Sequence, residues 1–131
     1  MLEVHPVETK EKQKEICAMC GIEYDADLLC YAAYVDGIIV GASQFKLDAG
    51  CGKVFDIANT KGIDDENALF VMGRATLNFI DLCGVHAAEF VGKDCSESLL
   101  RQIGYRKNGD GKWTMNLLGF FDAPCQHDKK E

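Results

Sequence analysis

The sequence has no long apolar segment and no concentration of positive charge. No apolar run approaches the roughly 20 residues that a membrane-spanning helix requires. The formal net charge of the 131 residues is −7, and no basic cluster exceeds Lys129-Lys130. Nucleic-acid-binding surfaces need clustered Lys and Arg side chains to neutralise phosphates. The composition therefore predicts neither a membrane segment nor a nucleic-acid partner.

Proline is scarce, and glycine is dispersed. The two prolines and 13 glycines do not gather into a linker, and we find no internal repeat. A chain of this length with 47% apolar and 27% charged side chains is typical of one globular domain with a hydrophobic core. We expect that domain to span residues 1–125, followed by a flexible tail at 126–131.

A secretory signal is not recognisable either. The first six residues lack both its basic segment and its apolar segment. The seven cysteines are odd in number, scattered, and mostly flanked by apolar residues, a pattern typical of buried thiols in a reducing compartment. These features predict a cytoplasmic protein.

Cys17 and Cys20 form a Cys-x-x-Cys pair, a spacing that is common in zinc sites. A structural zinc ion needs four ligands, and no second pair follows at finger-like spacing. Cys125 and His127 complete a Cys₃His set by count, but on a helix Cys17 and Cys20 extend the apolar face begun by Ile16. We therefore predict no metal site and expect both thiols to pack as apolar side chains.

The apolar periodicity predicts strand, helix, three strands, helix, strand, helix and two strands. The expected residues of these elements are, in order, 2–7, 10–20, 28–35, 38–47, 54–59, 64–83, 86–91, 94–104, 105–107 and 112–121. Asp36-Gly37, between two β-branched runs, is typical of a tight hairpin turn. The strand–helix–strand unit over 54–91 predicts a parallel crossover. The fold class is therefore α/β, with a mixed, mainly antiparallel sheet flanked by helices.

This order of elements resembles the GNAT superfamily of acyl-CoA-dependent N-acyltransferases, of which the chain looks like a divergent member. The stretch YAAYVDGIIVGASQF (31–45) is similar to the family's second and third strands, and SESLLRQIGYRKNGDGKWTMNLL (96–118) is similar to its closing helix and hairpin. The resemblance covers residues 2–121.

The resemblance implies transfer of an acetyl group from acetyl-CoA, or of another acyl group from its CoA thioester, to an amine. The partners would be this small-molecule acyl donor and an amine acceptor, and a homodimer through the last hairpin stays open. The alternative is a non-catalytic domain of the same fold that binds a small molecule or dimerises, since fold alone does not establish chemistry.

The family binds the CoA pyrophosphate with a Gln/Arg-x-x-Gly-x-Gly/Ala loop at the start of its long helix, where free amides and the helix dipole attract anions. Residues 70–75 match half of that loop, at Gly73 and Ala75, and Arg74 would then contact the phosphates. This register leaves about two turns of helix, too few for the family's long helix.

In the register that we favour, the helix starts near Asp64 and the loop falls on residues 63–68. Gly73 is then a packing glycine between helix and sheet. Asp64, Asp65 and Glu66 would lie beside the phosphates, where like charges repel. The cofactor motif is degenerate, and the sequence predicts weak CoA binding.

The other cofactor contacts that the resemblance implies are the backbone groups of Ile57 and Asn59, which would hold the pantetheine arm, and Lys93, which falls where an asparagine often contacts CoA. Leu100 stands where many members have a tyrosine general acid, and a leucine cannot donate a proton.

The best candidate for the catalytic base is Asp56, a carboxylate that interrupts an apolar run on the strand before the long helix. The alternative is a satisfied polar residue at a strand edge. Tyr105 is a candidate proton donor, as is Tyr31, although each is more often a core aromatic.

Overall fold

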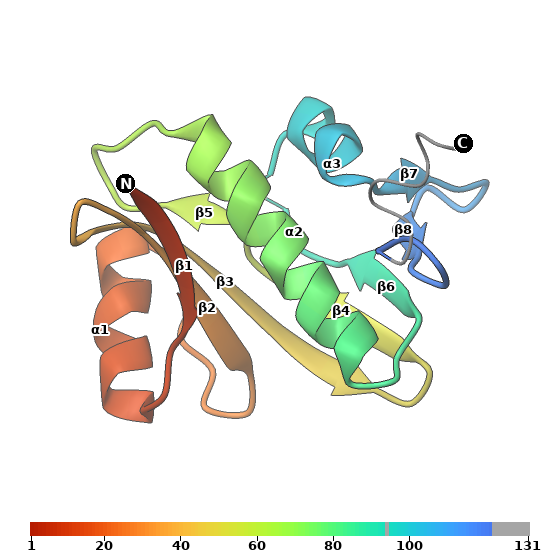
Figure 1. Ribbon diagram of the computed structural model, residues 1–131, viewed down its shortest axis with the longest axis horizontal. Coiled ribbons are helices and arrows are strands. Elements are labelled where there is room, and N and C mark those ends of the chain that lie inside the picture. Colours follow the sequence, from red (N-terminus) through yellow and green to blue (C-terminus); the bar gives the residue numbers. More distant parts are fainter. Residues whose placement is uncertain (94, 122–131) are drawn as a thin grey trace.

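The computed structural model describes residues 1–93 and 95–121 (Figure 1). The strands are β1 (Leu2–Pro6), β2 (Leu29–Val35), β3 (Ile38–Asp48), β4 (Cys51–Val54), β5 (Ala58–Asn59), β6 (Ala87–Phe90), β7 (Arg106–Lys107) and β8 (Trp113–Asn116), and the helices are α1 (Lys10–Cys20), α2 (Glu66–Leu82) and α3 (Glu97–Ile103). Among the described residues, no helix has the length and apolar character to cross a bilayer. The expected tail at 126–131 and the last residues of the expected domain lie outside the described part.

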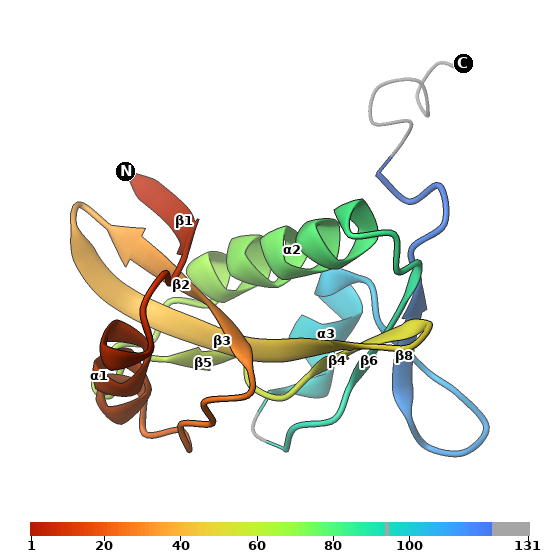
Figure 2. The same ribbon diagram turned by 90° about the horizontal axis from the view of Figure 1, so that it is seen from below.

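The strands form one sheet in the order β1-β2-β3-β4-β6-β8-β7, with β5 also paired to β3. Within the described residues, neighbouring strands run antiparallel except β4 and β6, which are parallel and joined by α2. The predicted mixed sheet and its parallel crossover are therefore confirmed. Helix α2 lies across one face of the sheet and α1 across the other (Figure 2).

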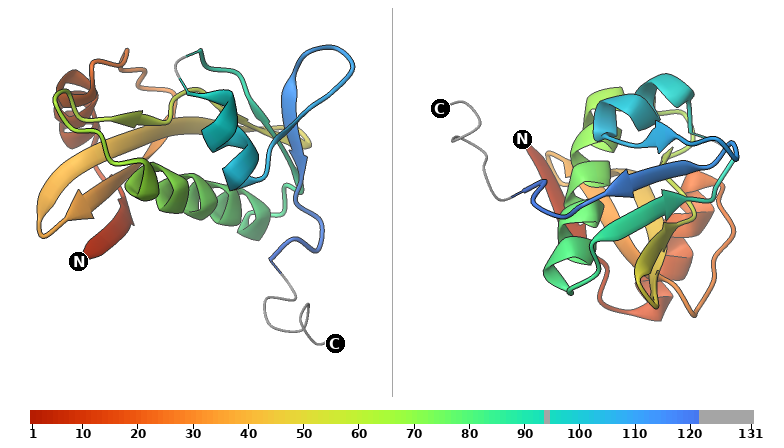
Figure 3. Two further views of the ribbon diagram at one scale, coloured as in Figure 1. Left: turned by 90° about the horizontal axis from the view of Figure 1, so that it is seen from above. Right: turned by 90° about the vertical axis from the view of Figure 1, so that its right-hand side faces the viewer.

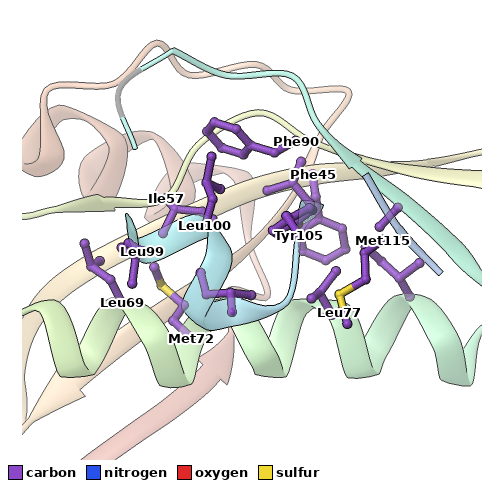
Figure 4. Close-up of a cluster of buried hydrophobic side chains, with 14 of the residues drawn as sticks. Phe45, Ile57, Leu69, Met72, Leu77, Phe90, Leu99, Leu100, Tyr105 and Met115 are labelled. Atoms are coloured by element: carbon purple, nitrogen blue, oxygen red, sulfur yellow. The ribbon is translucent and has the colours of Figure 1, made fainter. Parts of the chain in front are cut away.

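Each face of the sheet has its own hydrophobic core. The larger core fills the space between the sheet, α2 and α3, which lie side by side (Figures 3 and 4). The smaller core lies under α1 and comprises Ile16, Cys20, Cys30, Ala32, Ile39 and Ala42. Cys17 is fully buried and Cys20 nearly so, which confirms the prediction that both thiols pack as apolar side chains.

The hairpin between β2 and β3 forms where the sequence predicts it. Val35 pairs with Ile38, and Asp36 and Gly37 both have positive φ angles, 51° and 83°. Two left-handed residues give a turn whose twist matches that of the flanking strands, and glycine adopts such angles without strain.

The predicted single strand at 54–59 is in fact two short strands, β4 and β5, separated by a bulge at residues 55–57. Phe45 pairs with Val54 and Ala42 with Ala58, so three residues of this segment face two residues of β3. One extra residue shifts the register and bends the strand. Hydrophobic alternation does not reveal such an insertion, because both short strands keep apolar residues.

Beyond the parallel pair, the backbones of the bulge and of the segment after β6 are in contact. The Val91 N–H donates to the Val54 carbonyl at 2.8 Å. At Gly92 a Cβ would lie 2.2 Å from the carbonyl oxygen of Phe55. Only a residue without a side chain fits at this approach.

We predict that Gly92→Ala lowers the free energy of unfolding by about 1–3 kcal/mol, because the new methyl group forces the two backbones apart. Urea denaturation followed by circular dichroism measures the change. Gly109→Ala is the matched control, since nothing lies within 4 Å of its Cβ position. Equal stability of the two variants would contradict the close approach.

Candidate functional site

Asp56 lies on the wall between two cavities. The larger cavity, about 330 Å³, is lined by Gly21, Ile22, Glu23, Phe55, Asp56, Ile57, Ala58, Phe90, Val91, Gly92 and Lys93. The smaller, about 250 Å³, is lined by Glu23, Tyr24, Asp25, Leu28, Gln44, Phe55 and Asp56. Both cavities are lined by Glu23, Phe55 and Asp56. Asp56 is the carboxylate that the bulge contributes to this shared boundary.

The larger cavity lies along an edge of β5 that β3 does not use. Ala58 pairs with Ala42, and the Thr60 N–H donates to the Val40 carbonyl at 2.9 Å. Because an antiparallel ladder uses the peptide groups of alternate residues, the Ile57 carbonyl and the Asn59 N–H point away from β3. This edge offers one acceptor and one donor to an extended ligand.

The side chain of Asn59 has a structural role. Its amide donates to the carbonyls of Val40 at 2.9 Å and Asp65 at 3.3 Å, and its oxygen accepts from the Asp65 N–H at 3.1 Å. These bonds tie the β5–α2 loop to β3. The prediction for Asn59 as a cofactor contact therefore rests on its backbone.

The N-terminus of α2 carries its own carboxylate cap. The helix starts at Glu66, and Asp65 Oδ1 accepts from the Ala68 N–H at 3.0 Å. This start agrees with the register near Asp64. Beside it opens a cavity of about 480 Å³, lined by Glu66, Asn67, Phe70 and Gln102.

Gly73 lies in the middle of α2, far from any helix N-terminus, and it is buried against α3. A Cβ at this position would lie 2.5 Å from Cδ1 of Ile103. The interpretation as a packing glycine is confirmed. Its amide lies inside the helix, which argues against the assignment of Gly73 to the cofactor site.

Arg74 joins α2 to the end of α3. Its Nε donates to the carbonyl of Ile103 and its Nη2 to that of Gln102 at 3.2 Å. The guanidinium stacks 4.9 Å from the ring centroid of Phe70 and 5.0 Å from that of Phe120, and partial burial lowers its pKa. Two of its donors already bond carbonyls at the end of α3, which argues against Arg74 as a phosphate contact.

Tyr105 is a core residue. Its side chain is 1% exposed, and its ring packs edge-on against Phe90 at 6.3 Å (Figure 4). Burial raises the pKa of its hydroxyl far above the ordinary value. This burial argues against Tyr105 as a proton donor. Tyr31 likewise packs edge-on against Phe45 and Phe79.

Lys93 is exposed and lines the cavity of about 330 Å³ that it shares with Asp56. Its place there is compatible with a contact to an anionic ligand, and that role stays a prediction. Among residues 1–93 and 95–121, no three His, Cys, Asp or Glu side chains are grouped to hold a metal ion. Cys125 and His127 lie outside this part of the chain.

Gln44 is a site residue that the sequence reasoning missed. It is fully buried, and its Nε2 donates to Asp56 Oδ2 at 2.8 Å. The available signal was an amide in the middle of the apolar run of β3, where a polar side chain must find a buried partner.

We predict that Arg74→Met destabilises the domain by about 1 kcal/mol, because the partly exposed guanidinium bonds two carbonyls at the end of α3. Urea denaturation measures this change, and Lys14→Met, at an exposed position of α1, is the control. Calorimetric titration with CoA should show unchanged affinity. A tenfold loss of CoA affinity would restore Arg74 as a phosphate contact.

No protein-family model and no curated protein matches the sequence. Solved structures do match the fold. An IAA acetyltransferase from Bacillus cereus is 14% identical with a TM-score of 0.70, covering 89% of this chain and 100% of its own. A Bacillus subtilis acetyltransferase in complex with CoA is 12% identical with a TM-score of 0.70, covering 89% and 99%.

A third match is a GNAT family acetyltransferase from Brucella melitensis in complex with acetyl-CoA. It is 11% identical with a TM-score of 0.66, and the match covers 88% of each chain. Likeness at such low identity is a likeness of architecture. The chain has the fold of the GNAT acetyltransferases.

Proposed function

We propose that the protein transfers an acetyl or other acyl group from an acyl-CoA to an amine. The observation that carries this proposal is the position of Asp56, on the wall between one cavity that runs beside a free strand edge and a second, acidic cavity. A two-substrate transfer needs two adjoining spaces and a proton acceptor between them.

The acyl donor would occupy the larger of the two cavities that share Asp56, the one of about 330 Å³. The Ile57 carbonyl and the Asn59 N–H can pair with the amide groups of a pantetheine arm as a further strand would. Lys93 supplies a positive charge at the same cavity. The Bacillus subtilis and Brucella melitensis structures, which hold CoA and acetyl-CoA, support a CoA thioester as the donor class.

The amine would enter the smaller cavity. Glu23 and Asp25 line it together with Asp56, and three carboxyl groups favour a ligand that arrives as an ammonium ion. The ammonium must lose a proton before its nitrogen can attack the thioester carbonyl. Asp56 accepts that proton, directly or through a water molecule.

Asp56→Asn should lower kcat/KM for acetyl transfer by about 100-fold or more, because an amide cannot accept the proton. Affinity for acetyl-CoA, measured by calorimetry, should stay within about twofold. The transfer assay follows release of free CoA by chromatography with a panel of primary amines. Asp110→Asn, on an exposed loop, is the control. Full activity of Asp56→Asn would exclude this residue as the base.

Neutralising the acidic start of α2 should tighten CoA binding. Asp65→Asn keeps a cap of equal quality, and Asp64 is exposed, so the double variant Asp64→Asn, Asp65→Asn should fold normally. We expect a gain of about 5- to 30-fold in calorimetric affinity if both charges lie near the pyrophosphate. Unchanged affinity would place the pyrophosphate away from this helix end.

A further inference from the structure

Two buried glutamines connect helix α1 to the bulge. Gln13 of α1 is 1% exposed and Gln44 of β3 is 0% exposed. Gln13 Nε2 donates to Gln44 Oε1 at 2.9 Å, and Gln44 Nε2 donates to Asp56 Oδ2 at 2.8 Å. The three side chains form a directed chain of hydrogen bonds that ends on the carboxylate between the two cavities.

The surroundings of Gln44 fix the direction of its amide. Its oxygen accepts from the Asp25 N–H at 3.3 Å as well as from Gln13, and its nitrogen donates to the Glu23 carbonyl at 2.8 Å as well as to Asp56. The reverse orientation would place its oxygen against a carbonyl and a carboxylate. Gln44 therefore presents an N–H to Asp56.

Gln13 is held from the other side. Lys10 Nζ donates to Gln13 Oε1 at 3.1 Å, and Gln13 Nε2 also donates to the Leu28 carbonyl at 3.2 Å. Every polar atom of the two glutamine side chains has a partner. Such a satisfied buried network is rigid, because any rotation leaves a buried group unpaired.

We infer that Gln44 is the positioning residue for Asp56: it fixes the orientation of the carboxylate and stabilises its ionised form, with Gln13 as the anchor behind it. A hydrogen bond donated to a carboxylate favours the charged state. A role of Gln44 in catalysis rests on the proposed acyl transfer, but its hydrogen bond to Asp56 and the electrostatic effect of that bond do not depend on the proposal.

Other groups also act on this carboxylate. The titratable or charged groups near it include Cys17 and Cys20 of α1, Glu23 and Asp25 of the α1–β2 loop, and Lys93 after β6. Two of these are acidic and oppose ionisation of Asp56, and Lys93 favours it. The N–H of the buried Gln44 adds a short hydrogen bond that favours the charged state.

The test measures the titration of the Asp56 carboxyl carbon by ¹³C NMR in the full-length chain, with the resonance assigned by its loss in Asp56→Asn. In Gln44→Leu we expect the midpoint to rise by about one pH unit or more, because the donated hydrogen bond is lost. Ser43→Ala is the matched control. It changes the neighbouring residue on the same strand, whose buried Oγ has no hydrogen-bond partner among the described residues.

Gln13→Leu serves as a second variant, because Gln44→Leu removes four hydrogen bonds and its fold must be checked by circular dichroism. Gln13→Leu leaves Gln44 in place and removes one of the two hydrogen bonds to its oxygen, and we expect a shift in the same direction, about half as large. Titration midpoints equal to that of the unmodified protein in both glutamine variants would overturn the inference.

Activity separates this inference from the proposed function. In Gln44→Leu the acid limb of the pH profile of acetyl transfer should move to higher pH by the same amount as the NMR midpoint. If the unmodified protein transfers acetyl to none of the primary amines tested while the NMR shift occurs, the acyltransferase proposal fails and the positioning of Asp56 stands.

Discussion

The single extra residue in the bulge at 55–57 determines how the rest of the site is arranged. It separates β4, which continues the sheet toward β6, from β5, which keeps one edge free. It also turns Asp56 toward Gln44 and brings the Phe55 carbonyl against Gly92. A regular strand at this place would pair along its whole length and would leave neither a free peptide edge nor a carboxylate between two cavities.

The fold follows from local signals, and the site depends on contacts that no local signal contains. The Asp36-Gly37 turn and the periodicity of α2 each act within a few residues, so the sequence predicts them. The bonds from Gln13 to Gln44 and from Gln44 to Asp56 join segments 31 and 12 residues apart. Their formation depends on register, which the bulge shifts.

Two of the candidate site residues make structural contacts that their residue type does not indicate. Arg74 and Tyr105 have side chains that commonly bind phosphates or donate protons, but Arg74 bonds carbonyls at the end of α3 and Tyr105 packs against Phe90 of β6. Burial decides the role of such a residue more than its type does. By contrast, the prediction for Asp56 rested on an isolated carboxylate within an apolar run, and the structure gives this side chain a buried partner and a place at two cavities.

The buried thiols under α1 make it possible to detect when this helix separates from the sheet. Cys17, Cys20 and Cys30 lie buried between α1 and the sheet, whereas Cys83 is exposed at the end of α2. Burial raises the pKa of Cys20, which further suppresses reaction in the closed state. An alkylating reagent therefore modifies Cys83 at once, whereas it reaches the three buried thiols only when α1 lifts from the sheet. Because α1 carries Gln13, alkylation of these buried thiols reports the opening of the helix that anchors the glutamine pair.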